Sequence, residues 1–122
     1  MKSDRQLITE AVRDYFEGWF LGDADRMERA LHAGLAKRSL GRVDTDSPEL
    51  HSVTKDQMVG WTAAGEGITV ARDRDTTVDV RVVDLHGDIA SVVVRSAVYR
   101  EYLHLVRAHG EWRIVNGLWD YT

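Results

Sequence analysis

Apolar residues recur every third or fourth position along the first part of the chain, which is the spacing of an amphipathic helix. The stripe runs from Leu7 to Phe20 as a band two residues wide. Ser3 and Gln6 stand before it with the spacing of a capping box, and Gly22 follows it as a C-terminal cap. The pattern predicts a helix of about five turns with one buried face.

A second, shorter helix is predicted directly after this one. Asp23 can cap it, and its apolar positions end before Gly34, so His32 is expected in its last turn. Leu35–Val43 suits a short strand, and Asp44–Glu49, which holds the only proline, is expected to form a loop.

A third helix is predicted from Thr54, because Gln57 repeats the capping-box spacing; the two glycines of AAGEG should end it. After Thr76 the apolar residues recur at every second position instead of every third or fourth, which indicates strands. Turns at HGD and HGE separate some of them, but the boundary near Val98–Arg100 has no turn residue and is placed by length. The predicted strands are TTVDVRVVDL, IASVVVRSAV, YREYLHLVRA and WRIVNGLWDY.

Helices followed by a meander of strands predict an α+β fold in one domain spanning residues 1–122. A curved sheet wrapped around the first helix would bury its stripe and leave a cavity at one end. The chain is 43% hydrophobic and 30% charged, as expected of a globular protein.

Composition excludes several classes of function. The chain has no cysteine, which removes disulfides, thiol catalysis and thiolate-bound metal. The net charge is −4, and acidic and basic residues are interspersed along the chain, which argues against nucleic-acid binding. The chain has no apolar run long enough for a membrane span, and its N-terminal residues lack the apolar segment of a signal peptide. The five histidines lack metal-ligand spacing, so no metal is expected. No phosphate-binding loop occurs, and no cofactor is expected. These features favour a cytoplasmic protein.

The stretches YFEGWFLGDADRMERALHAGLAKR and YREYLHLVRAHGEWRIVNGLWDY resemble the NTF2-like superfamily, and more closely its SnoaL-like, "putative lumazine-binding" group. The resemblance implies a cone in which three N-terminal helices pack on a strongly curved mixed or antiparallel sheet. It leaves function open, because this scaffold hosts isomerases, dehydratases, ligand-binding modules and dimerisation domains.

Tyr15 is the first candidate site residue that the resemblance implies, because the ketosteroid isomerase branch places an oxyanion-donating tyrosine there. The alternative is that Tyr15 belongs to the buried helix stripe. The same branch needs a carboxylate base shortly after the second helix, where this chain has Ala36–Ser39. An isomerase of that mechanism is therefore not expected.

His32, implied at the cavity mouth, could act as acid or base, or could simply complement a helix dipole. Lys37 and Arg38 alternate, so only one can face inward; an inward Arg38 would bind an anionic group. Glu101 occupies a strand position at which relatives carry an inward acid, and it is expected to pair with His32 or Arg38. The opposite phase would turn Tyr102 and His104 inward instead.

Three functions follow from these residues. The first is binding of a small apolar or aromatic molecule in the cavity of the cone, by residues that include Tyr15, Trp19 and Trp61. The second is cofactor-independent proton transfer, elimination or hydrolysis that uses His32 and Glu101, with Tyr15 as a donor. The third is a homodimer through the outer sheet face, built on apolar residues drawn from Val93, Val115 and Trp119. The candidate ligand-binding residues are Tyr15, Trp19, His32, Arg38, Trp61 and Leu103.

Overall fold

The computed structural model describes residues 1–40 and 49–122. Residues 44–48 of the predicted loop and the end of the predicted strand, 41–43, therefore lie outside the described residues. No helix in these two segments combines the length and the apolar character needed to cross a bilayer. The elements in chain order are α1 Asp4–Leu21, α2 Ala24–Ala30, β1 Leu31–Leu40, β2 Leu50–Val53, α3 Lys55–Ala63, α4 Glu66–Ala71, β3 Val78–His86, β4 Ile89–Ser96, β5 Tyr99–Ala108 and β6 Glu111–Tyr121.

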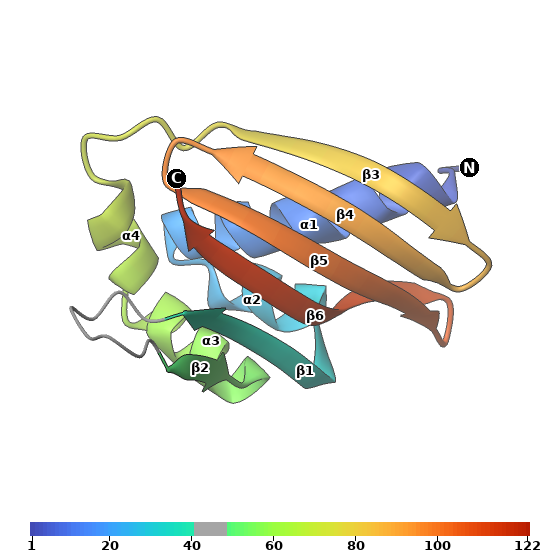
Figure 1. The fold of residues 1–122 in the computed structure, drawn as a ribbon, viewed down its shortest axis with the longest axis horizontal. Helices are drawn as coiled ribbons and strands as arrows, with labels where there is room; N and C mark the ends of the chain where they lie inside the picture. Colours follow the sequence, from blue (N-terminus) through green and yellow to red (C-terminus); the bar gives the residue numbers. More distant parts are fainter. Residues whose placement is uncertain (41–48) are drawn as a thin grey trace.

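The strands form one mixed sheet in the order β2-β1-β6-β5-β4-β3, in which β1 runs parallel to β6 and all other neighbours are antiparallel. Helix α1 lies along one face of this sheet, and α2, α3 and α4 lie on the same side (Figure 1). Buried apolar residues of α1 and of the inner sheet face form the core. The predicted α+β class and curved sheet are confirmed.

The helix caps explain where α1 and α3 begin. Both halves of the capping box are present at Ser3 and again at Thr54, as predicted. Gly22 ends α1 in the left-handed region, with φ 71°, where glycine carries no Cβ penalty.

The second helix is shorter than predicted. It ends at Ala30, and the chain passes into β1 at Leu31, which pairs with Ile114 of β6. Pairing with the sheet therefore replaces the expected last helical turn, and His32 lies on a strand.

Helix α4 was not predicted, because the glycines of AAGEG indicated a break in the helix. Strand β2 was not predicted either. Gly65, with φ 80°, precedes a new helix. Gly67 packs that helix directly on α1, because a Cβ at this position would overlap the Trp19 carbonyl. Four helices, rather than three, therefore occur in the described residues.

A side-chain turn marks the boundary between β4 and β5, which the sequence placed by length alone. Ser96 Oγ accepts hydrogen bonds from the backbone N–H groups of Val98 and Tyr99, at 3.2 and 2.8 Å. A serine can supply this turn without glycine or proline.

The narrow end of the fold is held by polar contacts to the first turn of α1. Asp4 Oδ1 accepts hydrogen bonds from Arg107 Nη1 at 2.9 Å and from Trp112 Nε1 at 3.1 Å. Arg107 Nη2 also lies 2.7 Å from Asp88 Oδ1 in the β3–β4 turn. These contacts join the start of α1 to three later segments.

Candidate functional site

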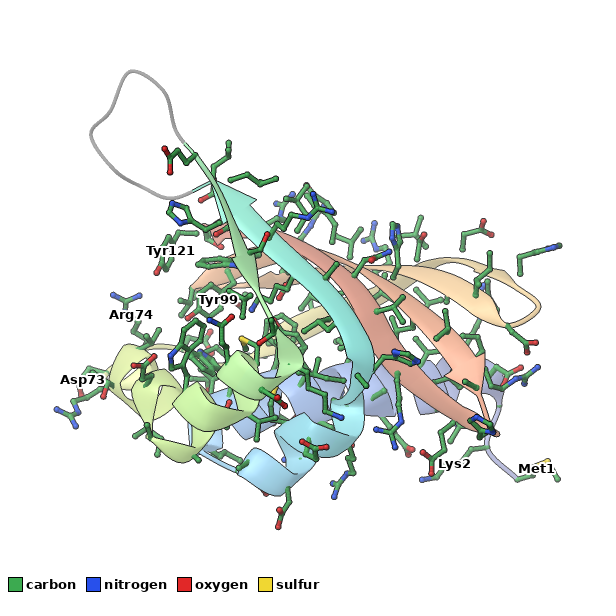
Figure 2. All side chains as sticks on the ribbon, turned by 90° about the horizontal axis from the view of Figure 1, so that it is seen from below. Met1, Lys2, Asp73, Arg74, Tyr99 and Tyr121 are labelled. Carbon is green, nitrogen blue, oxygen red and sulfur yellow. The ribbon has the colours of Figure 1, made fainter. Side chains whose placement is uncertain are left out.

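A cavity of about 230 Å³ lies at the opposite end, between the inner sheet face and helices α1, α3 and α4. Figure 2 shows Tyr99 and Tyr121 at this end, far from Met1 and Lys2. The residues that line the cavity are Tyr15, Phe16, Trp19, Lys37, Val53, Met58, Trp61, Glu66, Val70, Tyr99, Glu101, Trp119 and Tyr121.

Two opposite charges are buried at the floor of the cavity. Lys37 on β1 is 8% exposed and Glu101 on β5 is 1% exposed. Lys37 Nζ lies 3.9 Å from Glu101 Oε2, and it also contacts Met58 Sδ at 3.5 Å. The two groups form an ion pair, but 3.9 Å is too long for a hydrogen bond.

Gly117 makes room for this pair. It lies on β6, between β1 and β5, directly opposite Lys37 and Leu103 in the two ladders. A Cβ on Gly117 would lie 2.8 Å from Glu101 Oε2 and 3.5 Å from Lys37 Cγ. A larger residue would therefore push the carboxylate out of its position.

Burial changes the pKa of both charged groups. It lowers the pKa of Lys37, and the neighbouring Glu101 charge opposes that shift. It raises the pKa of Glu101, and here the Lys37 charge acts in the opposite direction. Burial also raises the pKa of the Tyr15 phenol well above its usual range, and the Glu101 charge adds to this effect.

Three buried polar atoms at the cavity have no hydrogen-bond partner among the described residues: Tyr15 Oη, Glu101 Oε2 and Trp119 Nε1. Glu101 is close enough to Tyr15 to affect its pKa, yet no hydrogen bond of ordinary geometry joins them. Because buried polar groups are normally paired, a set left open around one cavity indicates a place for a ligand or for water.

Aromatic side chains form the wall next to these atoms. Trp19 Nε1 donates to Tyr99 Oη at 3.1 Å, which holds the two rings together. Tyr99 contacts Trp119 edge to face at a centroid distance of 5.5 Å, and Trp119 contacts Tyr121 in the same manner at 5.1 Å. Trp61, 37% exposed, stands at the rim.

The structure places four of the predicted site residues along the cavity: Tyr15, Trp19, Trp61 and Glu101. Glu101 faces inward, and Tyr102 faces outward, so the first of the two predicted strand phases is the one observed. Leu103 is buried in the core and does not line the cavity.

Two predicted site residues lie elsewhere. His32 Nδ1 accepts a hydrogen bond from the Gly34 N–H at 2.9 Å, and His32 is not among the lining residues. Arg38 is exposed on the outer face, because β1 alternates and Lys37 takes the inward position. The structure therefore pairs Glu101 with Lys37, and not with His32 or Arg38.

Trp119 lies on the opposite face of the sheet from the one predicted. It was expected there beside Val93 and Val115, but it lines the cavity. Gly117 is buried on the inner side, and Trp119, two residues on, shares its face. The signal in the sequence for this face was the alternation of side chains along the strand.

No cluster of three or more potential metal ligands occurs in the described parts of the chain. A comparison with protein families matches residues 3–120 to a family described as "Putative lumazine-binding". None of the curated proteins matched the chain.

Solved structures share the fold at low sequence identity. An NTF2-like protein of unknown function from Silicibacter pomeroyi is 19% identical over all of both chains, with a TM-score of 0.76. An NTF2-like protein from Cytophaga hutchinsonii is 17% identical, with 99% and 100% of the two chains covered and a TM-score of 0.68. A ketosteroid isomerase-like protein from Erwinia carotovora atroseptica is 15% identical, with 99% and 98% covered and a TM-score of 0.64.

Proposed function

Because the chain belongs to the "Putative lumazine-binding" family of NTF2-like proteins, we propose that its cavity binds a small planar heterocycle with a lactam or imide edge. The observation that carries this proposal is the set of unpartnered polar atoms at Tyr15, Glu101 and Trp119 beside an aromatic wall. The function is reversible binding of that ligand.

The size and walls of the cavity favour a flat, compact molecule. Its volume of about 230 Å³ lies below the range of roughly 300–1,000 Å³ that is common for drug-sized ligands. Trp19, Tyr99 and Trp119 offer ring faces and edges against which a planar ring packs favourably.

The polar atoms specify the chemistry of the ligand edge. Tyr15 Oη and Trp119 Nε1 can donate hydrogen bonds, as can the Lys37 ammonium group, while an ionised Glu101 accepts. A lactam or imide presents a carbonyl acceptor next to an N–H donor, which matches such a set. Lumazine itself, a bicyclic dione, has this edge.

Calorimetric titration with lumazine tests the proposal, with naphthalene as a hydrocarbon of similar shape. Loss of one hydrogen bond from Tyr15→Phe or Glu101→Gln should weaken lumazine binding about tenfold. Naphthalene should bind the wild type and Tyr15→Phe equally. Equal lumazine affinity for the wild type and both variants, or no binding at all, would overturn the proposal.

The alternative of acid–base catalysis by His32 and Glu101 gains no support from the geometry, since His32 does not line the cavity. We also propose a homodimer through the outer sheet face. Its support is that Tyr102 and Leu118, paired across β5 and β6, are both about half exposed there. Association would cover these apolar surfaces.

A further inference from the structure

Lys37 differs from the other two lysines of the chain in where its amine lies. Lys2 is 60% exposed and pairs with Glu10. The side chain of Lys55 is 12% exposed, but its Nζ lies 2.9 Å from Glu28 Oε1, a 57% exposed partner, and it does not line the cavity. Lys37 lines the cavity, yet its side chain is only 9% exposed. A molecule inside the cavity would therefore meet a buried primary amine.

We propose that Lys37 captures aromatic aldehydes or ketones in the cavity by forming an imine with them. This inference rests on the proposed function in one respect, because the carbonyl compound must enter the same cavity. It goes beyond that function, because the bond formed is covalent and reversible.

The reaction can be balanced with groups that the structure brings together. The lone pair of Lys37 Nζ attacks the carbonyl carbon, and one amine proton passes by way of the Glu101 carboxylate to the carbonyl oxygen, giving a carbinolamine. The nitrogen lone pair then forms the C=N bond while the hydroxyl leaves. Glu101 takes the remaining proton from the iminium nitrogen and passes it to the departing hydroxide, so that one water is released and a neutral imine remains. No oxidant or reductant takes part.

The surroundings of the amine favour both steps. The Nζ atom lies 5.1 Å from the centre of the Tyr15 ring and 5.4 Å from that of Trp119. Glu101 Oε2, at 3.9 Å, is the nearby proton acceptor. Burial lowers the pKa of Lys37, which increases the share of neutral, nucleophilic amine. Tyr15 Oη, which has no partner in the described chain, can donate to a carbonyl oxygen.

The experiment is reductive trapping of the whole chain with 2-naphthaldehyde and cyanoborohydride near neutral pH, followed by peptide mapping. Lys2, Lys55 and the N-terminal amine are internal references. Because burial lowers the pKa of Lys37, its labelling should be at least about tenfold faster than that of either other lysine. Lumazine or naphthalene in excess should protect Lys37 alone. Lys37→Arg, which keeps the charge, should show no cavity adduct.

The outcomes separate this inference from the proposed function. Labelling of Lys37 no faster than that of Lys2 or Lys55 would overturn imine formation, and lumazine binding by calorimetry would still stand. Fast labelling of Lys37 without protection by either ligand would also overturn it, since the amine would then react outside an occupied cavity. If Lys37→Arg does not fold, the map of the wild-type chain decides alone.

Discussion

Lys37 Nζ and Glu101 Oε2 face each other across 3.9 Å at the floor of the cavity, buried and without a hydrogen bond between them. A buried pair of this kind adds little to stability, because desolvation offsets the attraction between the charges. The removal of one partner is different, since it leaves the other charge buried and uncompensated. The pair is therefore sensitive to single substitutions and to pH.

Lys37→Met should destabilise the protein in a pH-dependent way. Burial already raises the pKa of Glu101 above 4.5, and the loss of the Lys37 charge removes the opposing effect. A carboxyl whose folded pKa is raised contributes most stability when protonated, and this contribution is lost as pH rises through the folded pKa. Urea unfolding should show a loss of about 3 kcal/mol near pH 8 and a smaller loss near pH 5.

The double variant Lys37→Met, Glu101→Gln is the control for this prediction. It contains neither buried charge, so most of the stability lost near pH 8 should return. A single variant whose loss is the same near pH 5 and pH 8 would show that packing, and not the stranded carboxylate, is responsible.

Tyr15→Phe should make the protein more stable while it weakens ligand binding. The phenol oxygen is buried without a partner, and its removal eliminates an unsatisfied group at a gain of about 1 kcal/mol. Tyr102→Phe on the outer face, outside the cavity, is the matched control for binding and should leave lumazine affinity unchanged. Thermal unfolding and lumazine titration measure the two effects, and a marked loss of stability in Tyr15→Phe would contradict the prediction.

Gly117→Ala should preserve the fold and damage the site. The added Cβ would lie 2.8 Å from Glu101 Oε2, so the carboxylate must move, and lumazine affinity should fall about tenfold. Gly60→Ala is the comparison, because nothing lies within 4 Å of a Cβ there. This helical position should gain roughly 0.5–1 kcal/mol and bind unchanged. Unaltered lumazine binding by Gly117→Ala would refute the assigned role of the glycine.

Leu118→Arg should separate the proposed homodimer into monomers. The side chain is 51% exposed and lies opposite Tyr102 on the outer face, so a charge there opposes association but leaves the core untouched. Analytical ultracentrifugation of the wild type and the variant gives the answer. A wild type that sediments as a monomer at high concentration would refute the dimer.

Asp4→Asn should weaken the fold without affecting the cavity. The carboxylate accepts from Arg107 and Trp112 at the narrow end, and it is partly exposed, so we expect a loss of about 1 kcal/mol. Lumazine affinity per folded molecule should stay constant. Reduced affinity in the variant would show that the two ends are coupled.

The sequence predicted the elements that carry a strong local signal. The α1 stripe with its Ser3 and Gly22 caps was found as expected, as were the alternating strands after Thr76. Helix α4 was missed because its formation depends on a contact between Gly67 and α1, which local patterns do not encode. His32 was misplaced for a similar reason, since pairing with β6 overrides the last turn of α2.

The site was only partly predictable. The alternation of side chains along the strand indicated that only one of Lys37 and Arg38 faces inward. Which of the two does so depends on the register in which β1 pairs with β6, where Lys37 lies opposite Gly117. The partner of Glu101 follows from that register, so sequence spacing could not identify it. Gly117 lies two residues before Trp119 and therefore on the same face of β6, which the structure shows to be the inner one.

The contacts of Asp4 have a consequence for how such proteins diversify. They anchor the scaffold at the end away from the cavity, so rim positions such as Trp61 and Glu66 take no part in these anchoring contacts. A chain only 19% identical shares this architecture. We therefore expect a laboratory library restricted to the rim to change which ligands bind while most of its members still fold.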